Sequence, residues 1–197
     1  MSHTLDARTV KSGLRADVLR RRDAMGPVGR EKASAEIAER ALRLIAEANP
    51  AVLAAYRAIR TEVDPAAVVE WALARNITVA LPAITDSATL VFRHYRPGIP
   101  LAAAGYGTLS PGRQAPELDP AVLLVPLAGF DRAGHRLGYG RGYYDRGLAN
   151  LRERGLRPLA IGLAFAAQEV DAIPSEPHDV RMDWVVTENE AIDCRKL

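Results

Sequence analysis

The sequence predicts a three-layer α/β domain, in which an open, mainly parallel sheet carries helices on both faces. Two patterns support this prediction. Short apolar runs typical of buried strands alternate with segments of helical periodicity, and such alternation favours parallel strands joined by helices. The chain has 197 residues, the length of one domain with a core of its own. We therefore expect residues 1–197 to form a single domain.

Two helices are predicted at the N-terminal end. Residues 6–23 carry apolar side chains four apart, which form one stripe on a helix: Val10, Leu14 and Val18. Residues 26–29, Gly-Pro-Val-Gly, break that pattern. Residues 31–48 then give a second amphipathic helix, which we assign to packing alone.

Strands and helices alternate over the rest of the chain. Strands are expected at residues 51–59, 77–81, 90–93, 123–125, 157–165 and 184–186, and helices at residues 66–75 and 145–154. Pro65 suits the first turn of a helix with Asp64 as its cap, and Pro82 is expected to end a strand. Residues 96–120 are rich in proline and long enough for a binding loop.

Composition restricts the possible partners. A formal net charge of +2 is too small to indicate a nucleic-acid partner. Cys194 is the single cysteine, so no internal disulfide can form. The N-terminus lacks the apolar core of a signal peptide, and the longest apolar stretch, near residues 121–130, is too short to cross a bilayer. We expect a cytoplasmic monomer or homodimer that acts on small molecules, without nucleic-acid or membrane partners.

The stretch 129–145 carries the strongest functional signal. It follows a predicted buried strand and precedes a predicted helix. Three glycines leave the backbone free to take positive φ and let a ligand approach main-chain N–H groups: Gly138, Gly140 and Gly142. Arg136 and Arg141 add guanidinium forks suited to phosphate oxygens. Asp145 adds a hard oxygen of the kind Mg²⁺ takes beside substrate phosphates. The stretch therefore predicts a phosphate-binding loop.

The complete motif is a more specific signal than its three glycines alone. It lacks the Gly-Lys-Ser/Thr of a P-loop, and Tyr143 stands where a dinucleotide fingerprint needs its third glycine. Phe130-Asp131 followed by residues 136–145, Arg-Leu-Gly-Tyr-Gly-Arg-Gly-Tyr-Tyr-Asp, resembles the signature of the 5-formyltetrahydrofolate cyclo-ligases, also called methenyltetrahydrofolate synthetases. The resemblance implies an open α/β sheet related to sugar-phosphate isomerases and coenzyme A transferases. It also implies closure of 5-formyltetrahydrofolate to 5,10-methenyltetrahydrofolate with ATP and Mg²⁺.

The resemblance extends to the first helix. Lys11-Ser-Gly-Leu-Arg15 is similar to the opening of the family, whose lysine and arginine contact ATP phosphates. Lys11 and Arg15 lie one helical turn apart, so both can reach one anion. The alternative is a solvated charged face of a surface helix.

A folate-binding side is expected near Glu62, which falls in the loop after the first predicted strand. The segment Glu-Val-Asp resembles the family segment whose glutamate contacts the folate, and the resemblance adds Arg57 on the same side. A carboxylate suits the adjacent N–H donors of a pterin. The alternative is a plain loop carboxylate. The chain departs from the family at residues 106–111, where Ser110 replaces an acidic residue.

A second metal ligand is expected near the C-terminus. His178-Asp179-Val180 resembles a family stretch whose first aspartate lies near metal and nucleotide. This makes Asp179 a partner of Asp145 for Mg²⁺. His178 beside Asp179 does not predict a transition-metal site, because no second His or Cys stands at ligand spacing.

Together the resemblance and the residues give a full set of expected roles. Catalysis is assigned to Arg141 and Tyr144. ATP is expected to contact Lys11, Arg15, Arg136, Gly138, Tyr139, Gly140, Arg141, Gly142, Tyr143 and Tyr144. The folate is expected to contact Arg57, Glu62, Tyr139, Gly140, Arg141, Gly142 and Tyr143. Two alternatives stay open: a relative that acts on another formyl or amide substrate, and a nucleotide-binding protein without catalysis.

Overall fold

The computed structural model describes residues 6–85, 89–104 and 108–196. Its main feature is a seven-stranded sheet of order β11-β10-β9-β6-β1-β2-β3. The strands are β1 (Val52–Ala54), β2 (Thr78–Ile84), β3 (Leu90–Tyr95), β6 (Val122–Pro126), β9 (Leu159–Leu163), β10 (Trp184–Val186) and β11 (Ala191–Asp193). The five inner strands run parallel, whereas β3 and β11 pair antiparallel at the edges. The predicted open, mainly parallel sheet is confirmed.

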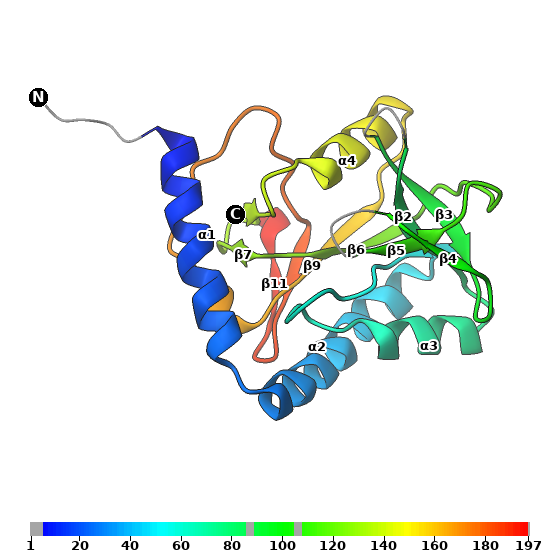
Figure 1. Ribbon diagram of the computed structural model, residues 1–197, viewed down its shortest axis with the longest axis horizontal. Coiled ribbons are helices and arrows are strands. Elements are labelled where there is room, and N and C mark those ends of the chain that lie inside the picture. Colours follow the sequence, from blue (N-terminus) through cyan, green and yellow to red (C-terminus); the bar gives the residue numbers. More distant parts are fainter. Residues whose placement is uncertain (1–5, 86–88, 105–107, 197) are drawn as a thin grey trace, which may run out of the picture.

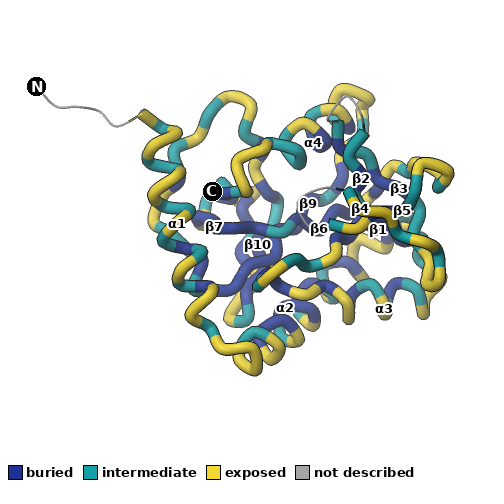
Figure 2. Tube along the Cα trace, in the orientation of Figure 1, coloured by how far each residue is buried: buried dark blue, intermediate teal, exposed yellow. Residues whose placement is uncertain are grey.

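Helices cover both faces of this sheet (Figure 1). Helices α2 (Pro27–Ala48) and α3 (Ala66–Ala74) lie on one face, and α4 (Tyr143–Glu153) lies on the other. Successive strand residues alternate between the two layers. Leu53 packs in the α2–α3 core, whereas its neighbour Ala54 packs in the core under α4. Figure 2 shows the strands as a buried centre with the exposed residues on the outer segments. The three-layer prediction is therefore confirmed.

Helix α1 (Ala7–Ala24) lies outside these layers, at the end of the sheet. It packs against the short strand β7 (Gly129–Phe130) and the 3₁₀ turn η1 (Ala166–Gln168), which follow β6 and β9. Val18 is fully buried there with Ala128, Leu137 and Ile173. The helix thus crosses the carboxyl ends of parallel strands, where open α/β sheets bind ligands.

Several element boundaries differ from the predictions. Strand β1 is shorter than the predicted residues 51–59. Helix α2 begins at Pro27 rather than at the predicted residue 31, because proline is well accommodated in the first helical turn. Pro82 does not end a strand: β2 continues through it to Ile84. The β1 register reaches only Ala80, so at Pro82 the missing N–H breaks no ladder bond on that side.

The predicted binding loop at residues 96–120 contains a small sheet of its own. Strands β4 (Leu101–Ala103) and β5 (Leu109–Pro111) pair antiparallel. Strand β11 was not predicted, nor was the pairing of β7 with β8 (Arg136–Leu137). Among the described residues, no helix is both long and apolar enough to cross a bilayer.

Candidate active site

A cavity of about 400 Å³ opens at the carboxyl edge of the sheet. Pro126 and Ile84, which end β6 and β2, lie in its wall together with Leu90, the first residue of antiparallel β3. The rest of the wall comes from the loop after β1, the glycine loop and the β4–β5 segment. Such a volume falls in the range of small-molecule sites. The cavity brings together these predicted site residues: Arg57, Glu62, Arg136, Gly138, Tyr139, Arg141, Gly142, Tyr143, Tyr144 and Asp145.

The glycine loop uses its backbone freedom at two positions. Gly140 has a φ of 84° and Gly142 a φ of 62°, backbone angles that residues with a side chain rarely adopt. Gly138 does not have a positive φ. A Cβ added at Gly138 or Gly140 would meet nothing within 4 Å. Gly142 is the N-cap of α4, which starts at Tyr143 rather than at the predicted residue 145. The N-terminus of α4 therefore lies at the cavity, where its unpaired N–H groups and dipole attract anions.

Helix α1 carries a row of cations on one face, none of which is among the described residues that line the cavity. Lys11, Arg15 and Arg22, with Val18 between them, follow the i, i+4, i+7, i+11 spacing that places residues on one helix face. Arg15 Nε donates a hydrogen bond to the carbonyl of Gly138 at 2.6 Å. In the structure the guanidinium of Arg15 therefore holds the backbone of the glycine loop. Its predicted contact with ATP phosphate stays a prediction.

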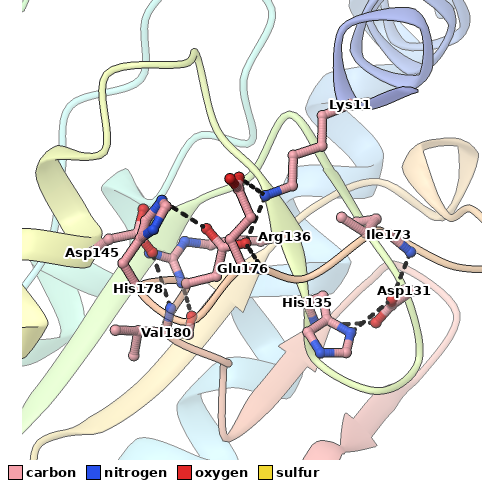
Figure 3. Close-up of polar contacts among 10 residues, drawn as sticks. Lys11, Asp131, His135, Arg136, Asp145, Ile173, Glu176, His178 and Val180 are labelled. Carbon is pink, nitrogen blue, oxygen red and sulfur yellow. Dashed lines mark hydrogen bonds and ion pairs between the residues drawn. The ribbon is translucent and has the colours of Figure 1, made fainter. Parts of the chain in front are cut away.

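Arg136 and Asp145 form a partly buried ion pair (Figure 3). Arg136 Nη2 lies 2.6 Å from Asp145 Oδ1, and that oxygen also accepts the Val180 N–H at 3.1 Å. Arg136 Nη1 donates to the Val180 carbonyl. Burial lowers the pKa of Arg136, although the carboxylates of Asp145 and Asp179 oppose this effect. The two predicted metal ligands, Asp145 and Asp179, therefore both act on the pKa of the Arg136 guanidinium.

Lys11 is ion-paired with the segment after η1. Its Nζ lies 2.6 Å from Asp179 Oδ2 and 2.8 Å from Glu176 Oε2 (Figure 3). Burial alone would lower the pKa of Lys11, but the hydrogen bonds to both carboxylates raise it. Glu176, His178 and Asp179 offer ligand atoms within 4.8 Å of one another, and the single ammonium group of Lys11 offsets part of the charge of the two carboxylates.

We expect Lys11→Met to lower the free energy of unfolding by about 1 kcal/mol at pH 7, the value of one partly exposed ion pair. Burial would raise the pKa of Asp179, but the hydrogen bond from Lys11 lowers it below 3.8. The same ammonium group lowers the pKa of Glu176 from 4.5. The stabilisation is therefore fully present above about pH 4.5 and is lost as pH falls through the two lowered pKa values. Urea unfolding at a series of pH values from 7 downward through the acid range measures this, with Lys32→Met as the exposed control. A loss that stays the same at every pH would contradict it.

Glu62 is a buried carboxylate held by its own loop. Its Oε2 accepts the Ile59 N–H at 3.0 Å, and Glu62 N–H donates back to the Ile59 carbonyl at 3.2 Å. Arg60 between them has φ 54, which closes this turn. Burial raises the pKa of Glu62, opposed by the Ile59 N–H, by Tyr139 and by Arg22. Glu62 is 8% exposed and lies in the cavity wall, as the predicted folate-side position requires, while its bond to Ile59 also closes its own loop.

Tyrosines surround Glu62. The Tyr56 hydroxyl donates to the Val63 carbonyl at 2.7 Å. Burial and the charge of Glu62 raise the pKa of Tyr56 and of Tyr144, and they raise that of Tyr139 to about 12. All three hydroxyls therefore keep their protons at neutral pH and serve as hydrogen-bond donors.

Asp131, the second residue of the signature, has a structural position. It is 3% exposed, and its carboxylate accepts the N–H groups of His135 and Ile173 at 3.0 and 2.9 Å. It thus ties the turn that leads into the glycine loop to the segment before Glu176 (Figure 3).

Comparison with known proteins places these features in a family. Residues 7–188 match the model of the 5-formyltetrahydrofolate cyclo-ligase family. The chain belongs to the 5-formyltetrahydrofolate cyclo-ligase family. It is 34% identical over 150 residues to the 5-formyltetrahydrofolate cyclo-ligase of Mycolicibacterium smegmatis, covering 70% of this chain and 74% of the relative. It is 28% identical over 173 residues to the 5-formyltetrahydrofolate cyclo-ligase of Haemophilus influenzae, covering 85% of this chain and 91% of the relative.

Solved structures of cyclo-ligase relatives share the fold. The 5,10-methenyltetrahydrofolate synthetase of Aquifex aeolicus matches with a TM-score of 0.80 and 26% identity, covering 94% of this chain and 93% of that one. The synthetase of Mycoplasma pneumoniae matches with a TM-score of 0.73 at 22% identity, covering 90% and 98%, and supports the fold alone. The predicted family, fold and enzyme class, a ligase, are confirmed, which removes the alternative of a binding protein without catalysis.

Some features of this cyclo-ligase family member were not predicted. Arg60 lies in the cavity wall and was not assigned to the site. Arg22 was not assigned either, although it contacts Tyr139 of the wall and stands seven residues after Arg15 on the same helix face. Ser110, where the chain departs from the family, is buried in β5. Among the described residues, the cavity wall includes Thr108 and Leu109 but not Ser110. The neighbouring positions 105–107 lie outside the described residues.

Proposed function

We propose that this protein converts 5-formyltetrahydrofolate into 5,10-methenyltetrahydrofolate with hydrolysis of ATP to ADP and phosphate. One observation carries the proposal: a single cavity joins an anion-binding loop to a wall with a buried carboxylate, in a chain of this family. Gly142 and Arg141 lie on the first side and Glu62 on the second. We place both substrates in this cavity, at the cytoplasmic location that the sequence predicts.

The chemistry needs an activated oxygen. The formyl oxygen attacks the γ-phosphorus of ATP, the bond from that phosphorus to the bridging oxygen breaks, and ADP leaves. N10 then attacks the activated formyl carbon, the carbon–oxygen bond breaks to release phosphate, and N10 gives up its proton. Such phosphoryl transfer depends on positioning and on neutralised charge rather than on a nucleophilic side chain.

The residues divide between the two substrates. Arg136, Arg141 and the backbone at Gly138 to Gly142 would hold phosphate oxygens, and Lys11 would add a charge from α1. Glu62 would accept hydrogen bonds from the aminopyrimidine edge of the folate, near Arg57. Tyr144 would donate a hydrogen bond at the reacting centre, because burial and the charge of Glu62 raise the pKa of its hydroxyl and keep it protonated.

Mg²⁺ fits the donor set of Asp145 and Asp179, because carboxylate oxygens are its usual protein ligands beside phosphates. Asp145 uses Oδ1 for Arg136 and Val180, while Oδ2 faces the position of a Cβ on Gly142, 4.0 Å away. The bound ion would neutralise phosphate charge. In the structure the ammonium group of Lys11 pairs with Asp179. We propose that metal and nucleotide bind together: Mg²⁺ would then bind Asp179, and the ammonium group of Lys11 would pair with a phosphate of the nucleotide.

The proposal is tested by following methenyltetrahydrofolate absorbance with purified protein, 5-formyltetrahydrofolate, ATP and Mg²⁺. We expect product that depends on ATP and appears with one ADP per molecule. Product without ATP consumption, or none at any substrate concentration, would reject the proposal. Strong ATP hydrolysis with another formamide, and none with the folate, would favour the alternative substrate.

Removal of the metal gives a separate expected result. Excess chelator should reduce turnover by at least about 10²-fold, because uncompensated phosphate charge raises the barrier. Added Mg²⁺ should restore it. Turnover assayed with and without EDTA checks this, and Asp145→Asn should shift the restoring concentration upward. Full activity in EDTA would contradict the metal assignment while leaving the reaction itself intact.

A further inference from the structure

Arg22 is a buried charge that the reaction as proposed leaves without a role. It is 2% exposed and ranks among the largest fully buried side chains. The nearest carboxylate of its own helix is Asp23, whose Oδ1 lies 3.8 Å from Arg22 Nε and whose side chain is 59% exposed. Burying a guanidinium is costly unless hydrogen bonds and opposite charge compensate. The partners of Arg22 therefore matter.

These partners belong to the loop before Glu62 and to the glycine loop. Arg22 Nε donates to Thr61 Oγ1 at 3.0 Å, and Arg22 Nη1 donates to the Tyr139 hydroxyl at 3.1 Å. Thr61 precedes Glu62, and Glu62 and Tyr139 both line the cavity. Thr61 Oγ1 in turn donates to Asp23 Oδ1 at 2.5 Å, so two neighbouring residues of α1 hold the Thr61 hydroxyl. Arg22 thus links the two loops.

The contacts of Arg22 end beside Glu62. Arg22 holds Thr61, the residue before Glu62, and the hydroxyl of Tyr139, which lines the cavity together with Glu62. The charge of Arg22 also favours the ionised form of Glu62, which burial disfavours. The carboxylate of Glu62 itself accepts the Ile59 N–H of its own loop.

We propose that Arg22 is a positioning residue for the folate side of the site: by holding Thr61 and the Tyr139 hydroxyl, it fixes the loop that orients Glu62 toward the cavity. We assign it no direct contact with either substrate, because its guanidinium is buried by Thr61 and Tyr139 and it is not among the described residues that line the cavity. The inference rests on the proposed function, because a reduced folate supplies the paired N–H donors that such a carboxylate selects. Its consequence is selective: folate affinity depends on Arg22, and nucleotide affinity does not.

The test compares Michaelis constants for the two substrates in three variants. Arg22→Met removes the charge and the fork, Arg22→Lys keeps the charge alone, and Tyr139→Phe removes the bridging hydroxyl. We expect Arg22→Met to raise KM for 5-formyltetrahydrofolate by about 30-fold or more, as loss of a charge-assisted hydrogen bond allows. KM for ATP should stay within about twofold. Arg22→Lys should recover part of the loss. Tyr139→Phe should act in the same direction, and the double variant should show less than the product of the two effects.

Controls separate this role from a structural one. Arg20→Met replaces an exposed arginine of α1 that pairs only locally with Asp17, and it should leave both constants unchanged. If Arg22→Met does not fold, Arg22→Lys and Tyr139→Phe decide, since Tyr139 is 37% exposed in a loop. Equal rises for ATP and folate, or a folate KM within twofold of wild type in the folded variants, would overturn the inference. Absence of methenyl product from the wild type would instead reject the proposed function.

Discussion

Arg141→Ala is expected to lower kcat for methenyltetrahydrofolate formation by about 10³-fold, with the free energy of unfolding unchanged within about 0.5 kcal/mol. Arg141 is exposed and lies in the cavity wall beside the N-cap of α4. In the proposed reaction, truncation there removes a guanidinium that would balance transition-state charge, and the side chain removed is exposed. Steady-state kinetics and urea unfolding of the same preparation measure both quantities.

A matched control lies at the other end of the same helix. Arg154 is exposed and pairs with Asp119, so Arg154→Ala should retain wild-type turnover. Arg141→Lys should fall between wild type and alanine, because it keeps the charge but loses the bidentate fork. A kcat of Arg141→Ala within threefold of wild type would remove Arg141 from the catalytic group.

Glu62→Gln is expected to reduce kcat/KM for 5-formyltetrahydrofolate by about 10²-fold or more, with KM for ATP nearly unchanged. The substitution keeps the shape of the side chain and replaces an acceptor-only carboxylate by an amide that presents N–H groups to N–H donors. A site built to hydrogen-bond its ligand discriminates strongly against such a mismatch. Kinetics with each substrate varied in turn measure the effect.

Glu117→Gln provides the control for that change. Glu117 is a surface carboxylate paired with Arg93 and is absent from the described residues of the cavity wall. It should leave both Michaelis constants as in wild type. Should Glu62→Gln raise KM for ATP as strongly as KM for the folate, the assignment of Glu62 to the folate side would be wrong.

Local pattern was enough to predict the sheet and its layers. The alternation of apolar strands with periodic helices predicts a parallel sheet covered by helices on both faces. That topology in turn places a ligand cavity at the carboxyl ends of the strands. The glycine loop was equally visible, because strand, glycines and helix are contiguous in sequence. Pro82 misled the prediction, since a proline is tolerated inside a strand where the neighbouring strand has already ended.

Long-range pairing explains what was missed. Arg22 contacts Thr61 and Tyr139 across 39 and 117 positions, and Lys11 contacts Asp179 across 168. No local periodicity predicts such partners. Lys11 and Arg15 were predicted to contact phosphate, which stays a prediction, and the contacts that the structure gives them are with carboxylates and a loop carbonyl. The i+7 relation between Arg15 and Arg22 was the available signal for the third cation of that row.

The proposed reaction depends on transfer of the γ-phosphoryl group to the formyl oxygen inside this cavity. The direct test uses 5-formyltetrahydrofolate labelled with ¹⁸O in the formyl group, ATP and Mg²⁺, followed by mass spectrometry of the released phosphate. We expect one ¹⁸O atom in each phosphate formed with methenyltetrahydrofolate. Unlabelled phosphate alongside full conversion of the folate would contradict it.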